Sequence, residues 1–238
     1  MRKIIVALFL VALMASPAFA LFTNGGFETG DFTGWTVTGQ GGGQSGIWSS
    51  ASTMPGLTTD INPYNDNYMA RIGDSAGWSS SLHWTKLTQT DTVQATDQNI
   101  YVNWGAALVD PTNTYHSTSE QPFFSISIFF NGVLANSFSA ASGDHSGWTQ
   151  VGTNAPGWSG GIMWYRNGTY SYDLTGRSGQ NMTIELYVQD CTLSGHGGFA
   201  FLDGIGTTYQ PPNGVPEPAT LILLGLGLAG MATLRKKF

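Results

Sequence analysis

The residues that could carry out chemistry are few, and their spacing does not mark a catalytic site. Residues 157–161 (GWSGG) fit the G-x-S-x-G pattern of a serine nucleophile, but a strand-like IMWYR follows where that pattern needs a helix. Residues 41–46 fit G-x-G-x-x-G, yet they follow no buried parallel strand and open no helix, so they indicate a loop and not a nucleotide site. Four histidines lie far apart without zinc-ligand spacing, at positions 83, 116, 145 and 196.

Acidic residues are numerous, but no closely spaced set of them stands out. Glycoside hydrolysis needs two carboxylates that flank the scissile bond, and the 14 acids of residues 21–214 leave room for such a pair. No E-x-D-x-E cluster occurs. The sole cysteine, Cys191, has no histidine or cation beside it in sequence, which predicts a small buried residue in a strand and not a reactive thiol. We expect a protein that is not an enzyme, with a hydrolase as the less favoured alternative.

Aromatic side chains in loops offer a different chemistry, because the apolar face of a sugar ring stacks on an exposed aromatic ring while Asn or Gln binds its hydroxyls. The chain has eight tryptophans. Five loop residues are candidate ligand contacts: Trp78, Trp148 and Trp158 in Gly/Ser-rich loops, and Tyr64 and Tyr115 in polar loops. The alternative is that these rings anchor loops. The tryptophans at 35, 84, 104 and 164 lie in strands and are expected to fill the core.

The charge of the chain excludes one class of partner. Residues 21–214 contain 14 acids against four basic residues, a net charge of about −10. Such a surface repels phosphate backbones, so we expect no nucleic acid as a partner. Neutral sugars and divalent cations remain compatible with it. One cysteine also means that no internal disulfide can form.

The polar–apolar pattern predicts an all-β protein. Apolar residues alternate along residues 100–108, 124–130 and 182–188, and no sustained 3.6-residue period occurs in the body. Asn131-Gly132 and Asn167-Gly168 each suggest a type I′ hairpin turn. Nine or ten short strands with frequent turns favour an antiparallel β-sandwich of the jelly-roll type. We place it at residues 21–209, followed by a tether at 210–214.

The two ends have the pattern of targeting segments. Residues 1–20 combine a basic start, an apolar run and the small-residue exit Ala18-Phe19-Ala20, which predicts a secretory signal peptide with an A-x-A cleavage site at Ala18 and Ala20. Residues 219–234 carry no charge and would span about 24 Å as a helix, somewhat less than a hydrocarbon core of about 30 Å. With the basic cluster that follows on the cytoplasmic side, they predict a short C-terminal transmembrane helix.

Residues 215–238 resemble the PEP-CTERM sorting signal of Gram-negative bacteria. Val215 is followed by Pro216, Glu217 and Pro218, then by the apolar run, and the segment closes with Arg235, Lys236 and Lys237 before Phe238. The resemblance implies an exosortase as a processing partner, transient insertion in the inner membrane, and delivery to the cell surface or extracellular matrix after removal of the tail. Proteins of this class accompany exopolysaccharide and biofilm production.

The body resembles galactose-binding-like jelly-roll modules, which include carbohydrate-binding modules. The resemblance rests on the opening Asn24-Gly25-Gly26-Phe27-Glu28 and on the closing GHGGFAFLDGIGTTY at residues 195–209. It implies that the first and last strands are neighbours and that calcium is held there by the Gly26 carbonyl, Glu28 and Asp203. The family usually shows two adjacent acids, whereas Gly204 follows Asp203 here, so one oxygen source is missing. Without calcium, Glu28 and Asp203 would be solvated turn residues.

These observations together predict a secreted or cell-surface, non-catalytic protein that is processed by an exosortase and binds, or is embedded in, extracellular polysaccharide of a biofilm matrix. A structural surface protein that acts by protein–protein contact without a sugar site is the alternative.

Overall fold

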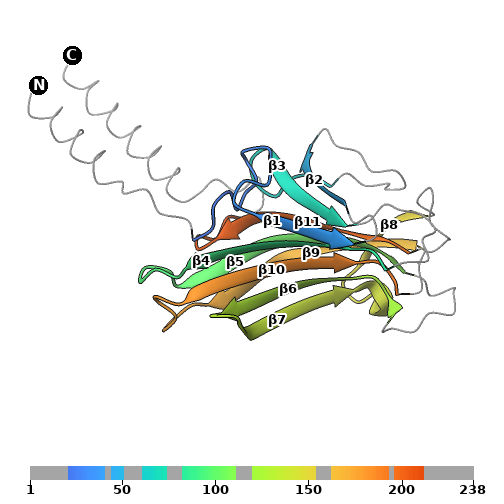
Figure 1. The fold of residues 1–238 in the computed structure, drawn as a ribbon. Coiled ribbons are helices and arrows are strands. Elements are labelled where there is room, and N and C mark those ends of the chain that lie inside the picture. The colour runs from blue at the N-terminus through green and yellow to red at the C-terminus, as the bar shows by residue number, and fades with distance from the viewer. Residues whose placement is uncertain are drawn as a thin grey trace, which may run out of the picture.

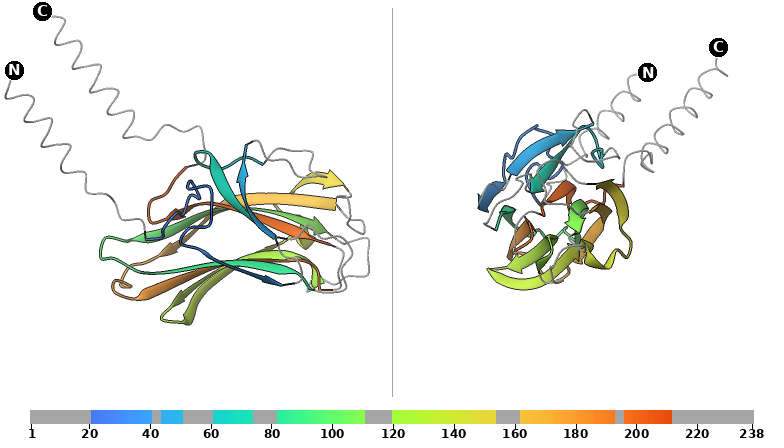
Figure 2. Two further views of the ribbon diagram at one scale, coloured as in Figure 1. Left: turned by 45° about the horizontal axis from the view of Figure 1, so that its top comes forward. Right: turned by 90° about the vertical axis from the view of Figure 1, so that its right-hand side faces the viewer.

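The computed structural model describes residues 21–40, 44–50, 61–73, 82–110, 120–153, 162–192 and 196–211. In this part of the chain, eleven strands form two antiparallel sheets that pack face to face (Figures 1 and 2). Sheet A contains, in spatial order, β1 (Thr36–Gln40), β4 (Trp84–Thr92), β10 (Asn181–Gln189), β6 (Phe123–Phe130) and β7 (Val133–Ala141). Sheet B contains β2 (Gln44–Ser49), β3 (Tyr68–Gly73), β11 (Gly198–Gly206), β5 (Asn99–Asp110), β9 (Ile162–Asp173) and β8 (Thr149–Thr153). The predicted all-β jelly-roll sandwich is confirmed.

The chain crosses repeatedly between the sheets, so most hydrogen-bonded strands are distant in sequence. Only β2–β3, β6–β7 and β8–β9 are neighbours both in the described chain and in a sheet. The last strand, β11, lies inside sheet B between β3 and β5, and its register with β5 shifts between Asp203 and Gly206. The fold is therefore completed by long-range strand pairs.

The main core lies between the two sheets and follows the alternation of the strands. In β6 and β10 every second residue is buried. Leu87, Ile126 and Leu186 of sheet A meet Val102 and Leu202 of sheet B in this core, and all five are fully buried. The period of two in the sequence thus reports the two faces of each strand. The alternation predicted along residues 100–108, 124–130 and 182–188 is confirmed.

Sheet B is buried on its outer face as well. A second apolar cluster covers the face of sheet B that points away from sheet A; its buried members are Trp48, Ile61, Met69, Ala107, Val109, Val151, Met163, Phe199 and Phe201. Tyr64, from the segment before β3, packs against it. Accordingly β11 is buried at every residue from Gly198 to Ile205, as expected of a strand covered on both sides.

One of the two predicted hairpin turns is wrong. Asn131 and Gly132 join β6 to β7 with φ of 50° and 82°, as a type I′ turn requires. Asn167 and Gly168, in contrast, lie in the middle of β9, which pairs with β5 along its whole length. Gly168 is opposite Trp104, and a β-carbon at Gly168 would lie 3.5 Å from that indole ring. The glycine makes room for the ring across the strands, so it serves packing and not a turn.

The opening segment lies against the last strand, as the family resemblance implied. The N–H of Ile205 donates to the carbonyl of Gly25 at 2.9 Å. A β-carbon at Gly25 would lie 1.8 Å from the carbonyl oxygen of Ile205, so no larger residue fits between the two backbones. Phe22 and Phe27, on either side of Gly25, are fully buried beside Trp35 and fix the segment to the core.

The predicted signal peptide at 1–20 and the C-terminal segment at 215–238 lie outside the described residues. The boundaries at residues 20 and 209 stay predictions. None of the helices within the described ranges has the length and apolar character needed to cross a membrane.

We predict that Gly25→Ala lowers the free energy of unfolding by about 2–3 kcal/mol, because the added methyl group meets a backbone oxygen that cannot turn away. Chemical denaturation measures this change. Gly206→Ala is the matched control, since a β-carbon at Gly206 meets nothing within 4 Å. Equal stability of the two variants would contradict the close approach of the opening segment to β11.

Candidate functional site

The carboxylates of Glu28 and Asp203, predicted as calcium ligands, lie close together and contact the segment that leads into β3. The Glu28 carboxylate accepts hydrogen bonds from the backbone N–H of Asn67, at 3.1 and 3.2 Å, and of Tyr68, at 2.8 Å. The Asp203 carboxylate accepts from the N–H of Asn65 at 2.8 Å and of Gly204 at 2.6 Å. The opening segment, the chain before β3 and the last strand thus converge here.

The two carboxylates differ in their surroundings. Asp203 is fully buried, whereas Glu28 is exposed. The pKa of Asp203 is raised to about 7, chiefly by burial and to a smaller extent by the nearby charge of Glu28, while the backbone hydrogen bonds oppose this shift. Near neutral pH the Asp203 side chain is therefore close to the point where it loses its proton.

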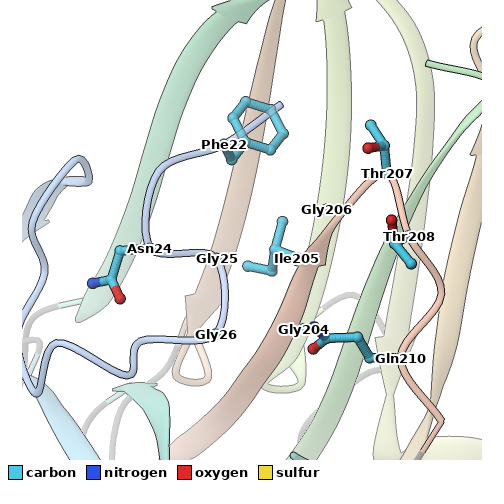
Figure 3. Close-up of a pocket in the computed structure, with 10 residues that line it drawn as sticks. All are labelled: Phe22, Asn24, Gly25, Gly26, Gly204, Ile205, Gly206, Thr207, Thr208 and Gln210. Atoms are coloured by element: carbon cyan, nitrogen blue, oxygen red, sulfur yellow. The ribbon is translucent and has the colours of Figure 1, made fainter. Parts of the chain in front are cut away.

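A cavity of about 340 Å³ adjoins these carboxylates. Figure 3 shows that it lies between the opening and closing segments of the body. Its lining is mostly backbone and small side chains: Phe22, Asn24, Gly25, Gly26, Gly204, Ile205, Gly206, Thr207, Thr208 and Gln210. Gly26 belongs to both features, since a β-carbon there would lie 3.7 Å from Asp203 Oδ1 and 3.7 Å from Glu28 Cγ. Gly26 thus lies between the cavity and the two carboxylates, although neither Glu28 nor Asp203 lines the cavity itself.

The donor atoms suit a hard cation in type but supply only part of a coordination sphere. Calcium takes six to eight oxygens, and Glu28 and Asp203 bring two carboxylates to one place beside Gly26. Within the described ranges, no three side chains of His, Cys, Asp or Glu form a group that could hold a metal ion. The calcium site stays a prediction.

The five aromatic residues expected to contact a ligand do not form one site in the described structure. Trp78, Trp158 and Tyr115 lie outside the described residues. Tyr64 is half-buried, and its hydroxyl donates to the Trp104 carbonyl at 2.9 Å and lies 2.8 Å from the hydroxyl of Tyr165. Burial raises the pKa of Tyr64, so this hydroxyl stays protonated. The Tyr64 side chain packs against the second apolar cluster.

Trp148 is not the exposed loop residue that its sequence context suggested. It is 7% exposed and belongs to the main core. The 3₁₀ turn η2 (Ser142–Asp144) follows β7. The backbone N–H of Trp148 then donates to the His145 carbonyl in a second turn, and the indole lies in the core. A sugar cannot reach either face of this ring, so the expectation of ligand contact at Trp148 is wrong.

Cys191 is fully buried, as predicted, but it lies after β10 and not in a strand. His196 Nδ1 is 3.3 Å from its Sγ, a neighbour that the linear sequence did not show. Both side chains are buried, so the pair offers no accessible nucleophile.

The outer face of sheet A carries an aromatic row that the sequence did not reveal. Trp84 of β4, Tyr187 of β10 and Phe123 of β6 lie on adjacent strands, and all three are half-buried. The ring of Tyr187 stacks on Trp84, with centroids 5.7 Å apart and 29° between the planes, and lies 5.7 Å from Phe123. Trp84, expected to fill the core, instead points away from it, because the buried residues of β4 are Thr85, Leu87 and Gln89, on the opposite face of the strand.

Polar groups surround this aromatic row. Trp84 Nε1 donates to Gln40 Oε1 at 3.0 Å, and the Tyr187 hydroxyl donates to Gln189 Oε1 at 2.8 Å. Lys86 and Glu185 form an ion pair at 2.9 Å beside it, so their charges cancel. Further along the same face, Thr and Ser hydroxyls continue the surface, including the pair Thr90–Thr183 at 2.7 Å. The outer face of sheet A therefore combines aromatic rings, amides and hydroxyls. The Lys86–Glu185 pair adds no net charge to it.

The sorting segment predicted from Pro216, Glu217, Pro218 and the basic cluster is matched by a known family model. Residues 214–237 match the PEP-CTERM protein-sorting motif. The chain carries a PEP-CTERM sorting signal. This motif marks an exported protein whose C-terminal tail anchors it in the membrane until the tail is cleaved, after which the body resides at the cell surface or outside the cell. A search of curated proteins gives no sequence match.

Solved structures that are similar to this PEP-CTERM chain have low sequence identity to it and TM-scores below 0.5. TmCBM61, solved in complex with beta-1,4-galactotriose, is 14% identical with a TM-score of 0.47, covering 81% of this chain and 100% of the other. CBM28, a carbohydrate-binding module specific for non-crystalline cellulose, is 13% identical with a TM-score of 0.40, covering 79% and 94%. CBM27-1 of Caldicellulosiruptor saccharolyticus, solved with mannohexaose, is 12% identical with a TM-score of 0.37, covering 81% and 97%. These likenesses are too distant to say what this chain binds.

We predict that the stability of the metal-free protein falls as pH rises from about 4 to 7 because of Asp203. The pKa of Asp203 is about 7 in the folded protein and 3.8 for an unperturbed aspartate. Between these values the folded state binds a proton that the unfolded state has lost, so the free energy of unfolding decreases as pH rises. Asp203→Asn removes this part of the pH dependence. Urea unfolding at a series of pH values, in chelator, measures it.

The matched control is Asp91→Asn, at an exposed acid of β4, which leaves the fall in place. The same pH profile for wild type and Asp203→Asn would show that Asp203 is not held in a buried, charge-disfavouring site.

Proposed function

We propose that this exported protein is a non-catalytic polysaccharide-binding protein, and that the outer face of sheet A is its binding surface. The observation that carries the proposal is the row of Trp84, Tyr187 and Phe123. Sugar rings stack on such aromatic faces, and the flanking glutamines can bind sugar hydroxyls. The sorting motif supports this setting, because it delivers the body to where extracellular polysaccharide is found.

The charge of the surface favours a neutral glycan. In a body with a net charge of about −10, the aromatic row stands beside a neutralised Lys86–Glu185 pair. A neutral chain can settle there without the repulsion that a dense polyanion would meet. The other described sheet face is less suited, since the second apolar cluster fills it.

We further propose that calcium binds at Gly26, Glu28 and Asp203 as a structural ion. The convergence of both carboxylates on residues 65–68 supports it. A cation there would offset the mutual repulsion of the two carboxylates and hold Asp203 ionised. The exposed side of Glu28 gives the ion its access.

The alternative, a structural matrix protein that acts by protein–protein contact, is favoured by a different observation. The edge strands of the two sheets are β1, β2, β7 and β8. They contain no charged residue and no proline, the residues that often prevent an edge strand from pairing with another chain. On β7, Val133 and Leu134 are 70% and 54% exposed. Concentration-dependent assembly without affinity for any glycan would favour this alternative.

We predict that Trp84→Ala lowers affinity for a bound neutral glycan at least tenfold, because it removes the largest ring of the row. A screen of neutral oligosaccharides with the full-length chain in detergent identifies the ligand, and titration calorimetry measures the loss. Phe129→Ala is the matched control, because Phe129 is a half-buried ring on the same face of β6, six residues away. An equal loss in both variants, or no binding by wild type, would rule out the aromatic row as the site.

We predict that calcium raises the melting temperature by on the order of 5 °C at saturating concentration, since it binds only the native state. Calorimetry with calcium or with chelator measures the shift. Asp203→Asn and Glu28→Gln abolish it, and Asp91→Asn keeps it. A shift that survives Asp203→Asn would place the ion elsewhere, and no shift in wild type would remove the calcium site from the proposal.

A further inference from the structure

Arg71 is a cation placed among aromatic rings on the outer face of sheet B. It is the half-buried residue of β3, and its guanidinium carbon lies 5.2 Å from the ring centroid of Trp48 and 5.2 Å from that of Phe199. Those rings are 4% and 1% exposed. The guanidinium therefore covers the second apolar cluster at its edge, and one of its faces is desolvated by the rings.

The guanidinium has no counter-charge in the described structure. Its buried Nε has no hydrogen-bond partner there, and it forms no ion pair with an acid of the described ranges. Lys86 and Arg177, in contrast, have acceptors in Glu185 and Gln180. Burial lowers the pKa of Arg71, which shows that its charge is poorly compensated.

The neighbouring strands leave one side of Arg71 open. Its cross-strand partner on β11 is Phe201, and its partner on the outermost strand, β2, is Gly46. Gly46 has no side chain, and a β-carbon placed there would lie 4.0 Å from Arg71 Nη2. An anionic group can therefore approach the guanidinium over Gly46 from the edge of sheet B.

We propose that Arg71 binds the carboxylate of a single uronic acid unit in an otherwise neutral polysaccharide, with the carboxylate seated over Gly46. A guanidinium holds a carboxylate through two parallel N–H···O bonds, and partial desolvation strengthens the pair. One isolated cation in a strongly acidic body suits one isolated carboxylate, because a dense polyanion would be repelled. The inference rests on the proposed function in one respect, that the protein binds polysaccharide. It does not depend on the aromatic row, because Arg71 lies on sheet B and Trp84 on sheet A.

The probe is a xylotriose that carries one glucuronic acid, compared with the methyl ester of the same compound. Titration calorimetry with the full-length chain in detergent measures both affinities. We expect the acid to bind at least tenfold more tightly than the ester, and this preference to shrink as salt rises. Arg71→Gln removes the preference and leaves affinity for the ester unchanged.

A second variant separates this role from simple packing. Gly46→Glu places a carboxylate beside Arg71 within the protein, so it raises the melting temperature and abolishes the preference for the acid. Gly46→Gln fills the same space without a charge, so it also abolishes the preference but gives no such rise in melting temperature. Trp84→Ala removes the binding on sheet A that acid and ester share and leaves the acid-specific binding at Arg71 in place, so failure of the aromatic row and failure of Arg71 give different results. Equal binding of acid and ester by wild type, binding of neither, a preference that persists in Arg71→Gln, or equal competition by a glutamate-rich peptide would overturn the proposal.

Discussion

Two carboxylates held by backbone amides join the three parts of the chain that close this sandwich. Glu28 belongs to the opening segment and accepts a hydrogen bond from the N–H of Tyr68. Asp203 belongs to the last described strand and accepts from the N–H groups of Asn65 and Gly204. Three of the donors, the N–H groups of Asn65, Asn67 and Tyr68, lie in the chain that leads into β3. The close approach of Gly25 to Ile205 depends on the same arrangement, since it brings the two ends of the body side by side. Removing either acid would break its hydrogen bonds to this part of the chain.

This arrangement also decides which sheet face is open. The segment before β3 is drawn onto sheet B by the carboxylates, and its residues Ile61 and Tyr64 pack on the outer face of that sheet. Sheet B becomes a layer with apolar clusters on both sides, and sheet A keeps a polar outer face with its aromatic row. The two proposed contacts with polysaccharide follow from this division: stacking on sheet A, and a charged contact at the rim of the cluster on sheet B.

The strands were predictable because alternation is a local property of the sequence, and the turn at Asn131-Gly132 was predictable for the same reason. The meeting of Glu28 with Asp203 was predictable only through the family resemblance, because residues 175 positions apart carry no local signal of contact. Long-range register could not be read at all. It places Gly168 against Trp104 and aligns Trp84, Tyr187 and Phe123 across three strands. Trp148 makes the same point, since the residues that bury it in the main core come from tertiary packing.

The interior position of β11 ties folding to export. β11 is the last strand of the described residues, and until it pairs, β3 and β5 each present a free inner edge in sheet B. The strand ends at Gly206, eight residues before the sorting motif begins at 214, a stretch that reaches at most about 28 Å. A chain that emerges N-terminus first thus cannot complete sheet B until its tail is arriving at the bilayer. The finished body is then held within a few nanometres of the lipid surface, where the protease that recognises the tail resides.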